Sequence, residues 1–143
     1  MQVKECMTRD VQTIAPCVSI AEAAQLMRDA DVGIIPVAKD DRLIGMITDR
    51  DIVVRIVAEG ICASATVRDA MTHDIECAFE DEEMSVVSRR MSELKVRRLP
   101  VLTREKRLCG IISLGDMARG DPHVAGAALA GASQPGQPHA SMS

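Results

Sequence analysis

Aromatic side chains are almost absent from this sequence. The 143 residues include a single phenylalanine, Phe79, and neither tryptophan nor tyrosine. Because proteins that bind single-stranded nucleic acid commonly stack the bases on aromatic rings, this composition argues against that function. The formal net charge of −4 argues against it too, since no block of basic residues is available to follow a phosphate backbone. We therefore expect no nucleic acid among its partners.

Long apolar runs and paired cysteines are also missing. No stretch approaches the ~18 consecutive apolar residues that a membrane-spanning helix needs, and the first residues, MQVKECM, lack the apolar centre of a secretion signal. The five cysteines form no C-x-x-C pair; they are Cys6, Cys17, Cys62, Cys77 and Cys109. We expect a soluble cytoplasmic protein without a membrane partner, whose thiols are mostly reduced and buried.

The most informative stretch is LIGMITDRDIVVR, residues 43–55. It predicts a short apolar strand, then a corner, then a helix whose apolar positions are Ile52, Val53, Ile56 and Val57. At the corner, the hydroxyl of Thr48 and the carboxylate of Asp51 lie beside the free backbone N–H groups of a helix start. This arrangement suits a phosphate and the sugar attached to it.

A weaker copy of this stretch, LCGIISLGDMAR, occupies residues 108–119, with Ser113 and Asp116 in the equivalent positions. The rest of the chain repeats as well. A shift of 64 residues superimposes Met7-Thr8 on Met71-Thr72 and Pro36-Val37 on Pro100-Val101, and the shift becomes 65 after a turn that is one residue longer. The chain is therefore an internal repeat, and the matches fall at turns, caps and apolar positions, where a common backbone needs them.

Each repeat predicts a strand, a helix, two strands and a second helix. In the first repeat we expect a strand at 11–14, a helix capped by Ser19 with Glu22 completing a capping box, strands at 34–37 and 43–47, and a helix that stops at Gly60. Helical spacing predicts two buried faces, which consist of Ile20, Ala23, Ala24 and Met27 in the first repeat and of Met84, Val87, Met91 and Leu94 in the second.

These elements predict an α/β (α+β) fold of two βαββα units related by a pseudo-twofold axis, with small sheets packed against helices. Neither unit would bury both faces of its sheet alone. We place the first repeat with its lead-in at 1–62 and the second at 63–122. Residues 123–143 are rich in Ala, Gly, Pro and Ser and are expected to form a flexible tail, with a short helix at 124–129.

Two copies of M-T, a capped amphipathic helix, h-P-V and G-h-h-[ST]-x-x-D resemble a tandem pair of cystathionine β-synthase (CBS) domains, over residues 3 to about 119. The resemblance implies a pair that usually dimerises into a flat disc and has two clefts for adenosine nucleotides or other adenosyl ligands: AMP, ADP, ATP, NAD or S-adenosylmethionine. It implies a stand-alone regulatory protein in signal transduction, a homodimer with an unknown protein partner, which is not an enzyme and requires no cofactor.

The resemblance also implies roles for the two corners. Asp51 and Asp116 would be the ribose-binding carboxylates, and Thr48 or Ser113, with nearby N–H groups, would hold a phosphate. A structural interpretation fits the same residues, because each hydroxyl can cap its helix while the aspartate three residues later completes a capping box. The two roles can coexist.

Two arginines, Arg97 and Arg98, come shortly before Pro100 in the second repeat, whereas the matching residues of the first repeat, Gly33 and Ile34, are uncharged. In the family these residues line the cleft that uses the other unit's aspartate, so Arg97 and Arg98 would face the Asp51 pocket and bind a phosphate there; the alternative is a solvated strand edge. We predict that the Asp51 pocket prefers phosphorylated adenosines and that the Asp116 pocket binds more weakly or prefers a less charged ligand. The remaining candidate ligand-binding residues are Thr8, Thr13, Gly33, Ile34, Pro36, Thr72, Cys77 and Pro100, of which Thr13 and Cys77 are expected near the base or in ordinary packing.

Two other functions remain open. The cysteines suggest a thiol- or metal-responsive stress sensor, although scattered cysteines at apolar positions are usually core residues, and the histidines, His73, His123 and His139, share no ligand spacing with them. The other function is a dimerisation module with empty clefts. We find no nucleophile–base arrangement, so we predict neither catalytic nor metal-binding residues.

In the second corner, Leu114-Gly115 replaces Asp49-Arg50 and Gly120 follows soon after, so a frayed helix would weaken that site.

Overall fold

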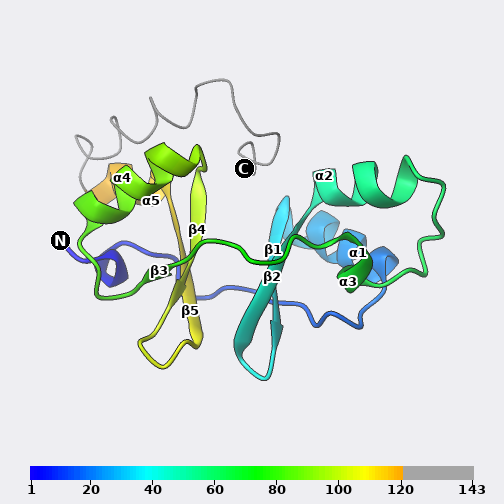
Figure 1. Cartoon of the computed structure of the whole chain (residues 1–143), viewed down its shortest axis with the longest axis horizontal. Helices are drawn as coiled ribbons and strands as arrows, with labels where there is room; N and C mark the ends of the chain where they lie inside the picture. The colour runs from blue at the N-terminus through cyan, green and yellow to red at the C-terminus, as the bar shows by residue number, and fades with distance from the viewer. Residues whose placement is uncertain (121–143) are drawn as a thin grey trace. The chain divides into compact units, whose positions relative to one another are not determined.

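The computed structural model describes residues 1–120, which form two compact units of mixed α+β structure (Figure 1). We call Gln12–Ile75 the N-unit, and Met1–Val11 together with residues 76–120 the C-unit. Each consists of a small sheet and helices, as predicted. The first residues of each predicted repeat, 1–11 and 63–75, belong to the unit that the other repeat mainly forms. The predicted boundary between the sequence repeats, after residue 62, stays a prediction. The helix expected at 124–129 lies outside the described residues.

The N-unit contains helix α1 (Ile20–Ala30) and the antiparallel hairpin of β1 (Ile34–Lys39) and β2 (Arg42–Thr48). The strand expected at 11–14 is wrong, since it is reduced to one parallel bridge between Ile14 and Val37. Pro16 follows two residues later, and it has no N–H group with which a ladder would continue. The hairpin turns at Asp40 and Asp41, both in the left-handed region (φ 54° and 63°), which suits a tight two-residue turn.

The capped start of α1 is confirmed, because the Ser19 hydroxyl accepts a hydrogen bond from the backbone N–H of Glu22 at 3.2 Å. Its buried face differs in one position from the prediction. Ala24 is exposed, whereas Ile20, Ala23 and Met27 are buried. Leu26, which was not predicted to face inward, packs against the same core, whereas Ala24 faces solvent.

The helix that follows β2 begins as α2 (Asp49–Ile52) and continues as a π-helical turn, η2 (Val53–Val57), before the chain turns at Gly60 with φ 70°. Ile52 and Ile56 are buried as predicted, but Val53 and Val57 are 57% and 65% exposed. The buried and the exposed residue of each pair are consecutive in the chain, so they lie on neighbouring stripes of the helix, of which one contacts the core. A short helix, α3 (Val67–Ala70), completes the unit.

The C-unit follows the predicted order more closely. A 3₁₀ turn, η1 (Val3–Glu5), precedes β3 (Ala78–Phe79), α4 (Met84–Leu94), β4 (Arg98–Leu102), β5 (Leu108–Ser113) and α5 (Leu114–Gly120). Strand β4 is central, parallel to β3 and antiparallel to β5. The predicted inner face of α4 is confirmed: Met84, Val87 and Met91 are buried, and Leu94 packs against the same core.

Each hairpin is bordered by the segment that precedes the other repeat. In the N-unit Thr72 bridges to Met46 of β2, and in the C-unit Thr8 bridges to Ile111 of β5. These bridges explain the glycine of the repeated motif. A Cβ atom on Gly45 would lie 2.5 Å from the carbonyl oxygen of Thr72, and one on Gly110 would lie 2.7 Å from that of Thr8. The N-terminal segment, expected as a lead-in, and the matching segment around Thr72 therefore each extend one hairpin by a single bridge.

Each unit has its own aliphatic core. The N-unit core gathers Ile35, Val37, Ile47, Ile56 and Met71, among others. The C-unit core includes Val3, Met84, Met91, Val101, Ile112 and Met117. Among residues 1–120, no helix combines the length and the apolarity that crossing a membrane would require.

Candidate functional site: two strand-to-helix corners

The corner of the N-unit joins β2 to α2. The backbone N–H of Thr48 donates to Oδ2 of Asp51 at 2.9 Å, and the backbone N–H of Asp51 donates to Oγ1 of Thr48 at 3.0 Å. The reciprocal pair confirms the predicted capping box. It also fixes the carboxylate, which belongs to a residue only 4% exposed.

The corner of the C-unit, between β5 and α5, repeats this geometry. The N–H of Ser113 donates to Oδ2 of Asp116 at 3.0 Å, and the N–H of Asp116 donates to Oγ of Ser113 at 3.1 Å. Asp116 is again 4% exposed. Two buried carboxylates thus occupy matched positions in the two units, each held through one oxygen.

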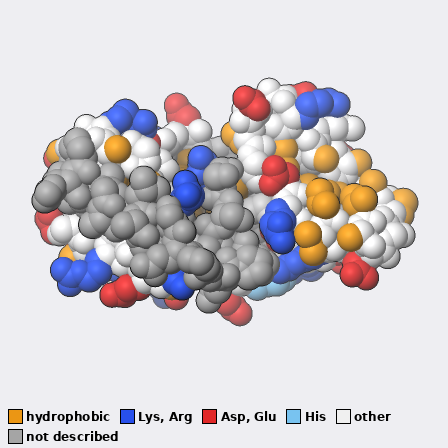
Figure 2. All heavy atoms as spheres, turned by 90° about the horizontal axis from the view of Figure 1, so that it is seen from above, with side chains coloured by type: hydrophobic (Ala, Val, Ile, Leu, Met, Phe, Trp, Pro, Cys, Tyr) orange, Lys and Arg blue, Asp and Glu red, His pale blue; other side chains and the backbone are white. Residues whose placement is uncertain are grey.

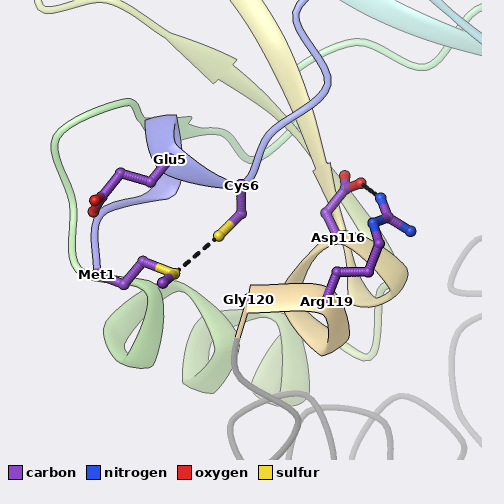
Figure 3. Close-up of a pocket in the computed structure, with 6 residues that line it drawn as sticks. All are labelled: Met1, Glu5, Cys6, Asp116, Arg119 and Gly120. Carbon is purple, nitrogen blue, oxygen red and sulfur yellow. Dashed lines mark hydrogen bonds and ion pairs between the residues drawn. The ribbon is translucent and has the colours of Figure 1, made fainter.

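The other oxygen of each carboxylate has different surroundings. In the N-unit, Oδ1 of Asp51 lies 3.8 Å from Nε of Arg55, which is too far for a hydrogen bond. In the C-unit, Nη2 of Arg119 contacts Oδ1 of Asp116 directly (Figure 3). Our sequence analysis missed both arginines, although their positions four and three residues after the aspartates are those at which helical side chains form ion pairs.

A cavity of about 360 Å³ lies beside Asp116, within the C-unit. Figure 3 shows its lining, which comes from η1, the residues that flank it and α5, and consists of Met1, Glu5, Cys6, Asp116, Arg119 and Gly120. Acidic and basic groups therefore share this wall with the sulfur atoms of Met1 and Cys6. Burial, followed by the charge of Glu5, raises the pKa of the Cys6 thiol, which is therefore protonated at neutral pH.

The structure brings together the predicted strand residues within each unit. In the N-unit, Ile34 pairs with Thr48, and Pro36 pairs with Met46, the residue that bridges to Thr72. The C-unit has the same arrangement, in which Arg98 pairs with Ser113, and Pro100 pairs with Ile111, the residue that bridges to Thr8. The carbonyl oxygens of Gly33 and Arg97 accept the first N–H group of α2 and α5, respectively, each at 3.0 Å.

Arg97 and Arg98 are half-buried, and neither side chain forms an ion pair or hydrogen bond with another described residue. Asp51, their predicted neighbour, belongs to the other unit, so its pairing with them stays a prediction. Thr13 is exposed and Cys77 is half-buried. The backbone carbonyl of Cys77 accepts a hydrogen bond from Nη1 of Arg90 at 2.9 Å.

The cysteines are free thiols, but the expectation that most are buried is wrong, because two are exposed and three are half-buried. Burial raises the pKa of Cys77 and, together with the charge of Glu80, raises that of Cys109 to about 11, so both stay protonated and unreactive at neutral pH. Cys62 differs, because it is exposed and a hydrogen bond from Ser64 lowers its pKa. Within residues 1–120, no group of three or more His, Cys, Asp or Glu side chains is placed to hold a metal ion.

The repeated corners and sheets coincide with the matches of a sequence profile. The profile of the CBS domain matches residues 3–58 and again residues 67–122. The chain belongs to the CBS domain family. The resemblance found in the sequence is thereby confirmed, and each unit of this CBS pair contains most of one matched segment.

Curated relatives and solved structures agree. The CBS domain-containing protein YhcV of Bacillus subtilis is 38% identical over 116 residues, which are 81% of this chain and 82% of the relative. The crystal structure of Hypoxic Response Protein I with two coordinated zinc ions is 34% identical, with a TM-score of 0.75, covering 83% of this chain and 98% of that one. The CBS domain pair of protein MJ0100 in complex with 5′-methylthioadenosine and S-adenosyl-L-methionine is 27% identical, with a TM-score of 0.73, covering 86% and 97%.

Proposed function

We propose that this CBS pair is a stand-alone cytoplasmic regulatory module that binds an adenosine-containing ligand and signals to a protein partner by a change of conformation. The ligand class comprises AMP, ADP, ATP, NAD and S-adenosylmethionine, and the module performs no catalysis of its own. The observation that carries the proposal is the pair of buried carboxylates at matched corners, of which Asp51 has one oxygen without a hydrogen-bond donor among the described residues.

A ribose donates hydrogen bonds of the kind that this oxygen accepts. No buried side-chain oxygen or nitrogen of the described residues lacks a hydrogen-bond partner, so Oδ1 of Asp51 is open to solvent, where a sugar hydroxyl would replace water. The MJ0100 pair, described in complex with two adenosine-containing molecules, supports this ligand class. Arg97 and Arg98, which make no ion pair with a described residue, supply charge that suits a phosphate.

Isothermal titration with AMP tests the assignment of the carboxylates. We expect Asp51→Asn to weaken binding by about 10- to 150-fold, the effect of losing a charged hydrogen-bonding partner, and Asp116→Asn to act on the second site. Asp69→Asn is the matched control, because Asp69 completes the same kind of capping box at α3 but is assigned no ligand. Unchanged affinity in the Asp51/Asp116 double variant would falsify the assignment.

We also propose that the module is a homodimer. An apolar patch, formed by Val53, Val54, Val57 and Ile61, is between 46% and 65% exposed on the N-unit, where hydrophobic side chains gather on the surface (Figure 2, right). A second copy of the chain would bury this patch. Light scattering should give twice the chain mass for the wild type and a smaller mass for Val57→Glu. An unchanged mass in this variant would place the interface elsewhere.

Signalling by a change of conformation has its own test. A ligand shifts a conformational equilibrium only if it binds one state more tightly than the other. We therefore expect small-angle X-ray scattering profiles of the dimer to differ with and without saturating AMP or ATP. Identical profiles would leave a binding module without this mechanism.

A second candidate function is a thiol-responsive sensor. The observation that favours it is Cys62, whose exposed thiol has a lowered pKa, while the zinc-containing relative shows that metal occurs on this scaffold. Thiol counting and metal analysis of the purified protein separate the two functions. Rapid reaction of one thiol, abolished in Cys62→Ser, together with no response to any adenosine compound, would favour the sensor.

A further inference from the structure

The arginine that follows Asp51 is held away from it. Nη1 of Arg55 donates hydrogen bonds to the carbonyl oxygens of Ala70, at 3.3 Å, and Met71, at 3.1 Å. These carbonyls lie at the end of α3, so the guanidinium is anchored to a neighbouring segment. Its Nε remains 3.8 Å from Oδ1 of Asp51, which leaves that oxygen free to accept a hydrogen bond.

The arginine that follows Asp116 takes the opposite position. Arg119 lies three residues after the aspartate instead of four, and its Nη2 contacts Oδ1 of Asp116. Its side chain is 73% exposed and has no other hydrogen bond or ion pair with the described residues. The residue that matches Arg55 in this unit is Gly120, which has no side chain to anchor. The oxygen that is open in one corner is therefore occupied in the other.

We propose that Arg119 is a specificity-determining residue that competes with the ligand's sugar for Asp116. The proposal rests on the proposed function, because it concerns the same ribose-binding carboxylates. A sugar hydroxyl reaches Oδ1 of Asp116 only after Arg119 leaves it, whereas Oδ1 of Asp51 needs no such displacement. The Asp51 corner therefore binds first, and the Asp116 corner binds more weakly by the strength of the ion pair between Arg119 and Asp116.

Adenosine is the probe of choice, because it carries the ribose without a phosphate and does not itself attract an arginine. The Asp51→Asn background isolates the second corner. In that background, we expect Arg119→Ala to tighten adenosine binding by up to about fivefold, the range of an ion pair whose arginine is exposed to solvent. Arg89→Ala is the matched control: Arg89 is exposed on α4 of the same unit and makes no hydrogen bond or ion pair with a described residue.

Salt gives a second readout that a general change of structure would not reproduce. Screening weakens an exposed ion pair, while a neutral ligand makes no salt-dependent pair of its own. Adenosine affinity should therefore rise between about 50 mM and about 500 mM KCl in Asp51→Asn, and it should stay constant in Asp51→Asn/Arg119→Ala. If Asp51→Asn does not fold, the wild type and Arg119→Ala are compared in a two-site titration, in which only the weaker site should tighten.

The possible results distinguish a failure of this inference from a failure of the proposed function. If the wild type binds no adenosine compound at all, the proposed function fails. If the wild type binds but Arg119→Ala leaves the weaker site unchanged or weakens it, the function stands and the role of Arg119 is wrong. Two sites of equal affinity in the wild type would overturn it as well.

Discussion

The two units hold the first segment of their sheets by different means. In the C-unit, Arg90 forms an ion pair with Glu82 at 2.5 Å and donates to the carbonyl oxygen of Cys77. Glu82 in turn accepts the N–H of Phe79 at 2.9 Å. At the matched positions the N-unit has Leu26 and Val18, two apolar side chains that pack against its core.

This difference coincides with a difference in secondary structure. The polar side chains bond directly to the backbone around β3, which is a true strand, whereas the matched segment of the N-unit is a single bridge at Ile14. Arg104 adds to the polar side, since it pairs with Asp81 at 2.8 Å and lies 4.3 Å above the Phe79 ring. One backbone plan can therefore be stabilised by apolar packing in one copy and by a polar network in the other.

The largest expected effect concerns the glycines under the bordering segments. Gly45→Ala should destabilise the protein by about 2–3 kcal/mol, because the new Cβ would lie 2.5 Å from a backbone oxygen that cannot move aside alone. Gly110→Ala should cost a similar amount, because its Cβ would lie 2.7 Å from the carbonyl oxygen of Thr8 and would press on the Met7 side chain as well. Urea unfolding measures both. A markedly smaller loss in one variant would show that its bordering segment yields more easily.

Sequence reasoning reached the parts of the fold that are local and repeated. The 64-residue shift, the glycines and the two capping boxes all follow from short patterns, and the structure has them. It could not show which stripe of the helix after Asp51 is buried. Val53 and Val57 fit the helical period as well as Ile52 and Ile56 do, and only the neighbouring elements decide between them.

Non-local features were out of reach for a different reason. That Thr8 borders the second hairpin and Thr72 the first depends on contacts between distant segments, which no periodicity records. The positions of Arg55 and Arg119 were visible in the sequence as neighbours of an aspartate. Which of them contacts its carboxylate depends on whether a carbonyl elsewhere holds the guanidinium.

Replacing the Arg90–Glu82 pair of the C-unit with the apolar residues of the N-unit tests whether the two arrangements are interchangeable. Arg90→Leu alone should destabilise the protein by about 1–2 kcal/mol, because it leaves the half-buried Glu82 without its cation. The double variant Arg90→Leu/Glu82→Val copies the N-unit and should recover most of this loss. Chemical denaturation of the wild type, both single variants and the double variant gives the coupling between the two sites. A double variant as unstable as the sum of the single variants would show that the C-unit backbone requires the polar network.

The same network should make the C-unit sensitive to acid. Burial opposes ionisation of Glu82, but the hydrogen bonds from Arg90 and Phe79 outweigh it and lower the pKa of this carboxyl. The stabilisation is therefore complete above the unfolded-state pKa, about 4.3, and is lost as the pH falls through the lower folded-state value. We expect stability to fall below about pH 5, and to fall less steeply in Arg90→Leu/Glu82→Val. The same acid dependence in both proteins would assign the effect to other carboxylates.

The smallest effect concerns the corners themselves, measured without ligand. Thr48→Ala and Ser113→Ala each remove the side-chain acceptor of a helix cap, which costs about 1 kcal/mol. The loss of stability should be larger for Thr48→Ala, because Thr48 is buried, whereas Ser113 is partly exposed and water can replace its hydroxyl. Conservative exchange of the hydroxyl residues, Thr48→Ser and Ser113→Thr, keeps both caps and should restore most of the stability in denaturant titrations. A larger loss at Ser113 than at Thr48 would mean that Arg119, through its contact with Asp116, makes the second corner the more rigid of the two.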